Sequence, residues 1–253
     1  MYDKDEPTTL DVNFDLESPL DKLGPPGETS DGPHYDPDVM LALLESAETQ
    51  QRMLGARAFC DLQDPRAIPH LIGLLQDPCP LVRVSAAYAL GRNPSPDAVL
   101  CLIEQLHRDW NGYARKGIVW ALGNCRDRRA IEPLVDTLRT DIPAVRLWAA
   151  SGLAQMANVG YEAVVVAIAP LIEAMRRDTM AAVRSNCAWA LGRLCRELPS
   201  NVVYATAIDA LIETFAEDSD LGVREDARAA ILKVGDTRGL QMIEEIEQDG
   251  FFI

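Results

Sequence analysis

The sequence predicts an all-α fold in which antiparallel helix pairs stack into an α-solenoid. The main observation is a phrase that recurs as VRVSAAYALG from Val82, ARKGIVWALG from Ala114, VRLWAASGLA from Val145, VRSNCAWALG from Val183 and VREDARAAIL from Val223. Each copy carries an arginine, and the successive arginines are 32, 31, 38 and 40 residues apart. A repeat of this period is typical of stacked helical units that each contact their neighbours.

A second observation is that an aspartate precedes each of these arginines by five or six positions. The pairs are Asp77 and Arg83, Asp109 and Arg115, Asp141 and Arg146, Asp178 and Arg184, and Asp218 and Arg224. Such a loop aspartate can accept hydrogen bonds from nearby backbone N–H groups and from an arginine of its own or an adjacent repeat. We therefore predict a structural ladder, with Asp109 as the partner of Arg115, rather than five copies of a catalytic carboxylate.

The helices are expected in six pairs that begin at about Asp36. The expected ranges are 37–47 with 49–62, 65–76 with 80–92, 96–108 with 112–125, 128–140 with 143–156, 161–177 with 180–196, and 200–217 with 220–234. Turns that contain Asp and Pro, such as DPCP at 77–80, end the first helix of a pair. DPRAIPHLIGLL at 64–75 and DRRAIEPLVDTL at 127–138 are near copies, each with a proline near the expected helix start. A last helix over 237–248 is expected to cap the stack.

Composition divides the chain into a tail over residues 1–35 and a repeat region over residues 36–253. The tail holds nine acidic residues, two lysines and five prolines, a composition that predicts disorder. Within it, Leu10, Val12, Phe14 and Leu16 alternate with polar residues, as in an extended strand with one apolar face. This segment is either a solvated tail, a short docking motif, or a segment that folds back on the repeats.

The formal net charge of −15 and the pI of about 4.6 argue against nucleic acid as a partner and against an anionic membrane surface. No apolar run reaches the roughly 18 residues of a membrane-spanning helix, and the acidic N-terminus is unlike a secretory signal. We expect a soluble cytoplasmic protein. The six cysteines form no CxxC pair and are expected to be reduced packing residues. No catalytic or metal-binding motif is present, so the sequence predicts no metal and no cofactor.

The loop Asp, the VR pair and the following AA and ALG resemble the HEAT-repeat superfamily over about residues 36–248. The short units resemble its phycobilisome lyase HEAT-like branch. The segments RMLGARAFCDLQDPRAI, DWNGYARKGIVWALGNCRDRRAIEPL, AVRLWAASGLAQM and AVRSNCAWALGRLCRELPSN are also similar to cyanobacterial HEAT-repeat proteins that interact with an A-type iron–sulfur carrier. The resemblance implies a cyanobacterial, cytosolic setting and such a carrier as a partner.

In HEAT-type stacks the second helices line the inner, concave face. Offsets +1, +5 and +9 from each arginine fall on one helical stripe, with offset +2 beside it. The predicted partner-binding residues are Tyr88, Arg92, Trp120, Asn124, Trp148, Asn186, Trp189 and Arg193. Trp, Tyr and Arg are enriched at interface centres. The alternative is that the rings only fill grooves between repeats.

From these features we expect a non-enzymatic scaffold or chaperone-like factor that binds a protein on its concave face. Its partner would be an iron–sulfur carrier or a photosynthetic assembly. The alternative is a phycobilin lyase, or a lyase-related protein that handles bilins, because aromatic residues on a concave surface could stack a linear tetrapyrrole.

Overall fold

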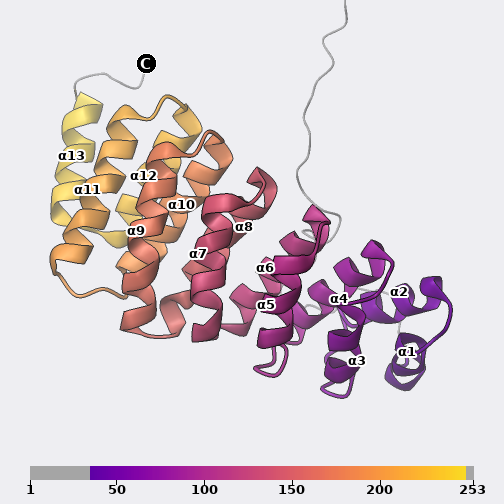
Figure 1. The fold of residues 1–253 in the computed structure, drawn as a ribbon. Coiled ribbons are helices and arrows are strands. Elements are labelled where there is room, and N and C mark those ends of the chain that lie inside the picture. The colour runs from indigo at the N-terminus through magenta and orange to yellow at the C-terminus, as the bar shows by residue number, and fades with distance from the viewer. Residues whose placement is uncertain (1–34, 249–253) are drawn as a thin grey trace, which may run out of the picture. The chain divides into compact units, whose positions relative to one another are not determined.

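The computed structural model describes residues 35–248, and this part of the chain is helical with no strand (Figure 1). The first helices of the pairs are α1 (Pro37–Leu44), α3 (Ala67–Leu74), α5 (Val99–Arg108), α7 (Ile131–Thr140), α9 (Tyr161–Arg177) and α11 (Val202–Glu217). The second helices are α2 (Thr49–Ala58), α4 (Pro80–Arg92), α6 (Gly112–Cys125), α8 (Pro143–Gln155), α10 (Ala181–Cys195) and α12 (Leu221–Val234). The predicted all-α solenoid of helix pairs is confirmed.

Short 3-10 turns extend two of the pairs, η1 (Arg128–Ala130) before α7 and η2 (Met156–Asn158) after α8. A last helix, α13 (Thr237–Gln248), packs on α11 and α12. The predicted tail, with Leu10, Val12, Phe14 and Leu16, lies outside the described residues apart from Tyr35.

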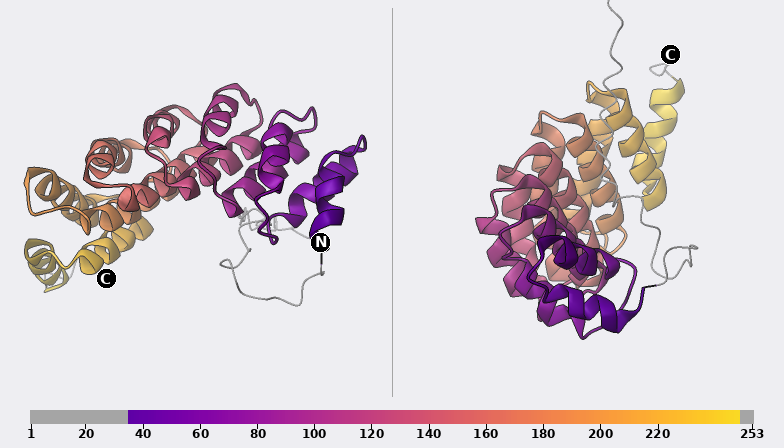
Figure 2. Two further views of the ribbon diagram at one scale, coloured as in Figure 1. Left: turned by 90° about the horizontal axis from the view of Figure 1, so that it is seen from below. Right: turned by 90° about the vertical axis from the view of Figure 1, so that its right-hand side faces the viewer.

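The even-numbered helices lie side by side in chain order and form one layer within residues 35–248, against which the odd-numbered helices pack (Figure 2). Local sequence explains where the helices of this layer begin and end. Prolines occupy the first turn of α4 and α8, where a missing N–H costs nothing. The Asn111 side chain accepts hydrogen bonds from the first free N–H groups of α6. α12 ends at Gly235, which adopts a left-handed φ of 74°.

Close packing between the even-numbered helices explains why glycine recurs in the ALG segments. A Cβ atom added to Gly123 of α6 would lie 2.8 Å from the Cα atom of Gly152 in α8. A Cβ atom added to Gly192 of α10 would lie 2.7 Å from the Cβ atom of Ala230 in α12. At these glycines successive helices approach so closely that a side chain there would push the layer apart.

The predicted ladder exists, and its carboxylate pairs join different repeats. Arg83 donates from Nε and Nη2 to the two carboxylate oxygens of Asp109, at 2.7 and 2.8 Å. Its Nη1 donates to the backbone carbonyl of Asp77 at 2.9 Å. The same carboxylate pairing recurs as Arg52 with Asp77, Arg115 with Asp141, Arg146 with Asp178, and Arg184 with Asp218. Each of these arginines therefore ties two consecutive repeats together.

Two details of the ladder differ from the sequence prediction. Asp109 is not the carboxylate partner of Arg115, which reaches Asp141 and bonds only the backbone carbonyl of Asp109. The reason is that the loop aspartate of the following repeat faces the guanidinium, whereas an arginine's own aspartate presents its main chain. Arg224, in the last repeat of the series, donates to the carbonyl of Phe215 at 3.0 Å.

Three of the ladder carboxylates, those of Asp109, Asp178 and Asp218, have pKa values below the ordinary value of an aspartate. Burial disfavours the charged form of Asp109, but hydrogen bonds from Arg83, the Asn111 amide N–H and Gln105 outweigh it, so the pKa of Asp109 is lowered. The same balance of burial against hydrogen bonds from an arginine and a backbone N–H lowers the pKa of Asp178 and of Asp218. Charge-assisted bonds of this kind fix the geometry between repeats.

Candidate functional site

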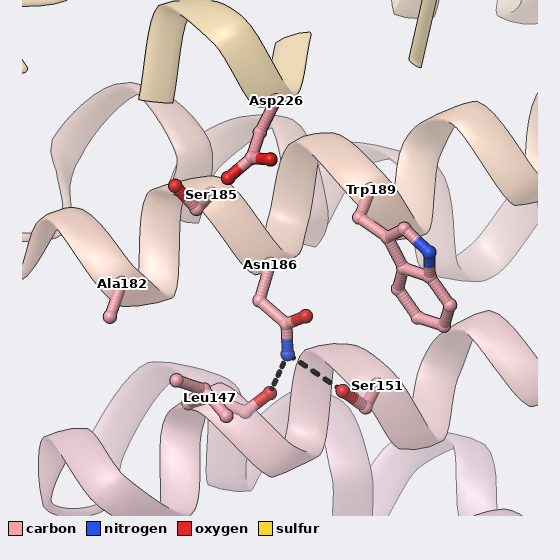
Figure 3. A pocket seen from close by; sticks show the side chains of 7 residues that line it. All are labelled: Leu147, Ser151, Ala182, Ser185, Asn186, Trp189 and Asp226. Carbon is pink, nitrogen blue, oxygen red and sulfur yellow. Dashed lines mark hydrogen bonds between the residues drawn. The ribbon is translucent and has the colours of Figure 1, made fainter. Parts of the chain in front are cut away.

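A hollow on the exposed side of the even-numbered layer is centred on Trp189 of α10. The largest of three adjoining cavities has a volume of about 560 Å³ and lies between α8, α10 and α12 (Figure 3). Its lining is Leu147, Ser151, Ala182, Ser185, Asn186, Trp189 and Asp226. A second cavity of about 260 Å³ continues towards the end of α10, and a third of about 190 Å³ continues towards α6. Because Trp189 lines all three, we call them together the Trp189 groove.

Three tryptophans from three consecutive even-numbered helices converge in this groove. Trp120 of α6 and Trp148 of α8 line the third cavity together with Trp189. Trp189 is 36% exposed, whereas the other two are half-buried. The ammonium of Lys116 lies 4.9 Å from the centroid of the Trp148 ring, a cation–π contact. The groove therefore combines an accessible ring with two rings that are packed into place.

Asn186 builds a wall of the groove. Its side-chain amide nitrogen donates to the carbonyl of Leu147 and to the hydroxyl of Ser151, both at 2.6 Å. Figure 3 shows the amide pointing from α10 to α8, with Trp189 on the same side of the helix. Asn186 therefore joins the two helices and fixes this wall of the groove.

Tyr88 and Arg92 are corrections to the predicted interface. Tyr88 is 4% exposed, and its ring packs against Trp120 with centroids 5.4 Å apart. The Nε of Arg92 donates to the carbonyl of Cys60 at 2.9 Å. The Tyr88 ring reaches Trp120 of α6 and the Arg92 guanidinium reaches the turn that follows α2, so α4 contributes contacts between repeats. Neither residue is among those that line the Trp189 groove. The Tyr88 ring fills a groove between repeats, which was the alternative to a binding role.

The remaining predicted residues lie at the groove and differ in what they contact. Asn124 lines the third cavity, and its amide also donates to the carbonyl of Gly91 at 3.2 Å. Trp120 is partly a packing ring, because a Cβ atom added to Gly91 would come within 2.3 Å of it. Arg193 lines the second cavity. A role of these residues in binding stays a prediction.

Sequence reasoning missed Asp226, Arg196 and Lys233, which also line the groove. Asp226 stands at offset +2 from Arg224, and Lys233 stands at offset +9. The stripe that predicted Trp148 and Arg193 would have found both, had it been continued into the fifth copy of the phrase. Arg196 lies beyond the stripe, and no repeat signal marks it.

The three buried thiols, those of Cys60, Cys187 and Cys195, are poor nucleophiles because burial disfavours the thiolate. Burial raises the pKa of Cys60 and of Cys195 to about 12, and it raises that of Cys187 as well. Cys79, Cys101 and Cys125 are half-buried. Among residues 35–248 no three His, Cys, Asp or Glu side chains are grouped so as to hold a metal ion. No helix in this part of the chain is long and apolar enough to cross a membrane.

Comparison with known families gives a match to HEAT repeats over residues 37–109 and 99–178, and to a single HEAT repeat over residues 168–198. Over 124 residues the chain is 34% identical to the bilin biosynthesis protein RpcF of Synechococcus sp. (strain WH8020). That match covers 47% of this chain and 57% of RpcF, so the chain spans little more than half the length of this relative.

Two solved structures show the same fold. One is the complex of CpcE and CpcF of phycocyanin lyase from Nostoc sp. PCC7120, with a TM-score of 0.56 at 23% identity over 85% of this chain and 82% of that one. The other is a designed armadillo repeat protein in complex with the peptide (KR)4, with a TM-score of 0.59 at 20% identity over 78% of this chain and 98% of that one.

These relatives overturn the main functional expectation. A non-enzymatic scaffold or chaperone is contradicted, because the sequence relative is named for bilin biosynthesis. They favour the alternative, a lyase-related protein that handles bilins. The iron–sulfur carrier has no support from these relatives and stays a prediction from resemblance alone.

Proposed function

Since this chain belongs to the HEAT-repeat family, we propose that it holds a linear tetrapyrrole in the Trp189 groove as a subunit of a bilin lyase. The observation that carries the proposal is the convergence of Trp120, Trp148 and Trp189 on one hollow of a chain related to a bilin biosynthesis protein. The acceptor of the pigment would be a cysteine of a phycobiliprotein.

The chemistry of the groove suits such a ligand. A bilin offers flat conjugated faces, pyrrole N–H donors and carboxylate side chains. The half-exposed ring of Trp189 offers a face for stacking, and the Asp226 carboxylate offers an acceptor for the pyrrole donors. The largest cavity, at about 560 Å³, falls within the range of roughly 300–1,000 Å³ that small-molecule sites occupy.

The state of the chain's own thiols favours noncovalent binding of the bilin over covalent attachment of the bilin to this chain. With a pKa of about 12, Cys60 and Cys195 carry almost no thiolate near neutral pH. No cysteine lines any of the three cavities of the groove. In the proposed reaction this protein therefore binds and orients the pigment, and the thiol that attacks it belongs to the acceptor protein. A second subunit would work with this chain, since the lyase relative is a complex of two proteins.

Titration of the purified protein with biliverdin, a linear tetrapyrrole, tests the proposal. Binding is read from the change in pigment absorbance and from quenching of tryptophan fluorescence. Trp189→Ala should weaken binding by about tenfold or more, because stacking on an aromatic ring contributes about 1–3 kcal/mol. Trp110→Ala is the matched control, since Trp110 is 75% exposed and lies outside the groove.

A second measurement tests the enzymatic part. The chain is mixed with its co-purifying partner subunit, a phycobiliprotein apo-subunit and phycocyanobilin, and covalent pigment is detected after denaturing electrophoresis. We expect attachment that depends on this chain and is weakened by Trp189→Ala. Absence of binding in the titration, together with attachment that is the same with and without the chain, would refute the proposal.

A further inference from the structure

Three cations meet at the end of the Trp189 groove formed by α10 and α12. Arg193, Arg196 and Lys233 line the second cavity, of about 260 Å³, together with Trp189 and Asp226. Arg193 lies in the last turn of α10, Arg196 is the residue that caps the C-terminus of this helix, and Lys233 comes from the last turn of α12. The cavity therefore carries three positive charges against the one negative charge of Asp226.

This group of cations is unusual for the chain, which has 39 acidic residues and only 24 lysines and arginines. Elsewhere the arginines are commonly paired, as in the ladder and in surface pairs such as Arg176 with Glu213. Within residues 35–248, no carboxylate lies within salt-bridge distance of Arg193, Arg196 or Lys233. Arg196 and Lys233 are exposed, so solvent can hydrate them, and only the half-buried Arg193 needs a partner. The three charges together make this cavity attractive to an anion.

Arg193 gives the sharpest sign of a missing partner. Its Nε is buried and has no hydrogen-bond partner among the described residues. Its Nη2 makes one long hydrogen bond, of 3.4 Å, to the side-chain oxygen of Gln155. A buried donor that has lost water and gained no acceptor is destabilising, and a guanidinium presents Nε and Nη2 in the fork that a carboxylate matches.

We propose that Arg193, with Arg196 and Lys233 beside it, binds a carboxylate at this end of the groove. The inference rests on the proposed function, in which that carboxylate is a propionate side chain of the bilin. The pigment then lies with a propionate at Arg193, a ring face on Trp189, and its pyrrole N–H groups towards Asp226, which lines both of the larger cavities. The cations at this end of the groove thus determine the orientation of the bound pigment.

Biliverdin and its dimethyl ester test the site, because esterification removes both carboxylates and leaves the conjugated system intact. The parent protein should bind the free acid at least about tenfold more tightly than the ester, since hydrogen bonds to charged groups are worth that much. Arg193→Met should weaken binding of the acid by about tenfold and leave binding of the ester unchanged. Arg139→Met, which removes an exposed cation from α7 in the other layer, should change neither.

Equal affinity of the parent for acid and ester, or unchanged affinity of Arg193→Met for the acid, would overturn the carboxylate site while leaving bilin binding intact. Should neither pigment bind, 1-pyrenebutyrate and 1-pyrenebutanol replace them as an aromatic acid and its neutral counterpart. Tighter binding of the acid that is lost in Arg193→Met would then support the carboxylate site and refute the bilin function. No preference for the acid would refute both.

Discussion

Arg115 joins two repeats by donating to both carboxylate oxygens of Asp141, from Nε at 2.8 Å and from Nη2 at 2.6 Å. Its Nη1 donates at the same time to the backbone carbonyl of Asp109, at 2.9 Å. The two side chains of the ion pair are only 17% and 11% exposed. A single guanidinium therefore forms hydrogen bonds with a loop of its own repeat and with a loop of the next repeat.

Replacing this arginine should destabilise the stack. In Arg115→Ala the half-buried carboxylate of Asp141 loses its charged donor, which costs about 1–3 kcal/mol of unfolding free energy. Urea denaturation followed by circular dichroism measures the loss. Arg139→Ala is the control, because Arg139 is exposed and its nearest carboxylate, on Glu173, is 3.8 Å away. Identical denaturation curves for Arg115→Ala and the parent would mean that the pair contributes nothing.

Because of the ladder, the free energy of unfolding should fall in acid. The pKa of Asp109 is lowered in the folded state, so its contribution to stability is present above the unfolded pKa of about 3.9 and is lost as pH falls through the folded value. Asp109→Asn should therefore be less stable than the parent at about pH 7, and the difference should shrink at about pH 2.5. Denaturation at both pH values, with Asp136→Asn as an exposed control, measures this. A difference that grows in acid would contradict it.

The glycine beneath Trp120 should tolerate no side chain. In Gly91→Ala the new methyl group would meet the Trp120 ring at 2.3 Å, and displacing the ring costs about 1–3 kcal/mol. Gly73→Ala, on α3, meets nothing within 4 Å and should instead gain about 0.4–1 kcal/mol. Melting temperatures of the two variants should therefore move in opposite directions. A Gly91→Ala variant as stable as the parent would show that the ring moves aside freely.

Substitution of Trp120 should mainly reduce stability, whereas substitution of Trp189 should mainly reduce bilin binding. Trp120 packs on Gly91 and Tyr88, so Trp120→Ala should cost about 3 kcal/mol of stability. Trp189 is 36% exposed, and Trp189→Ala should cost less than about 1 kcal/mol while weakening biliverdin binding. Melting temperature and affinity are measured on the same samples. A strongly destabilised Trp189→Ala with unchanged affinity would remove the ring from the site.

Much of the architecture follows from the sequence. The repeated VR phrase and the loop aspartates marked five of the six helix pairs, and the last pair, for example, was expected at 200–217 with 220–234 and lies at Val202–Glu217 with Leu221–Val234. These features are local, because caps, turn residues and apolar periodicity act within one or two turns of a helix. The stripe at offsets +5 and +9 likewise grouped Trp120, Trp189 and Arg193, which all line the Trp189 groove.

Contacts between repeats were decided by the tertiary structure alone. The sequence did not determine that Arg115 reaches Asp141, that Tyr88 turns inward beneath Trp120, or that Lys233 joins Arg193 around one cavity. Each depends on how far one helix is rotated and displaced against the next, a quantity set by the packing of small residues such as Gly123 and Gly152. A periodic sequence specifies which face a side chain occupies, but the helix-to-helix offset determines which neighbour it meets.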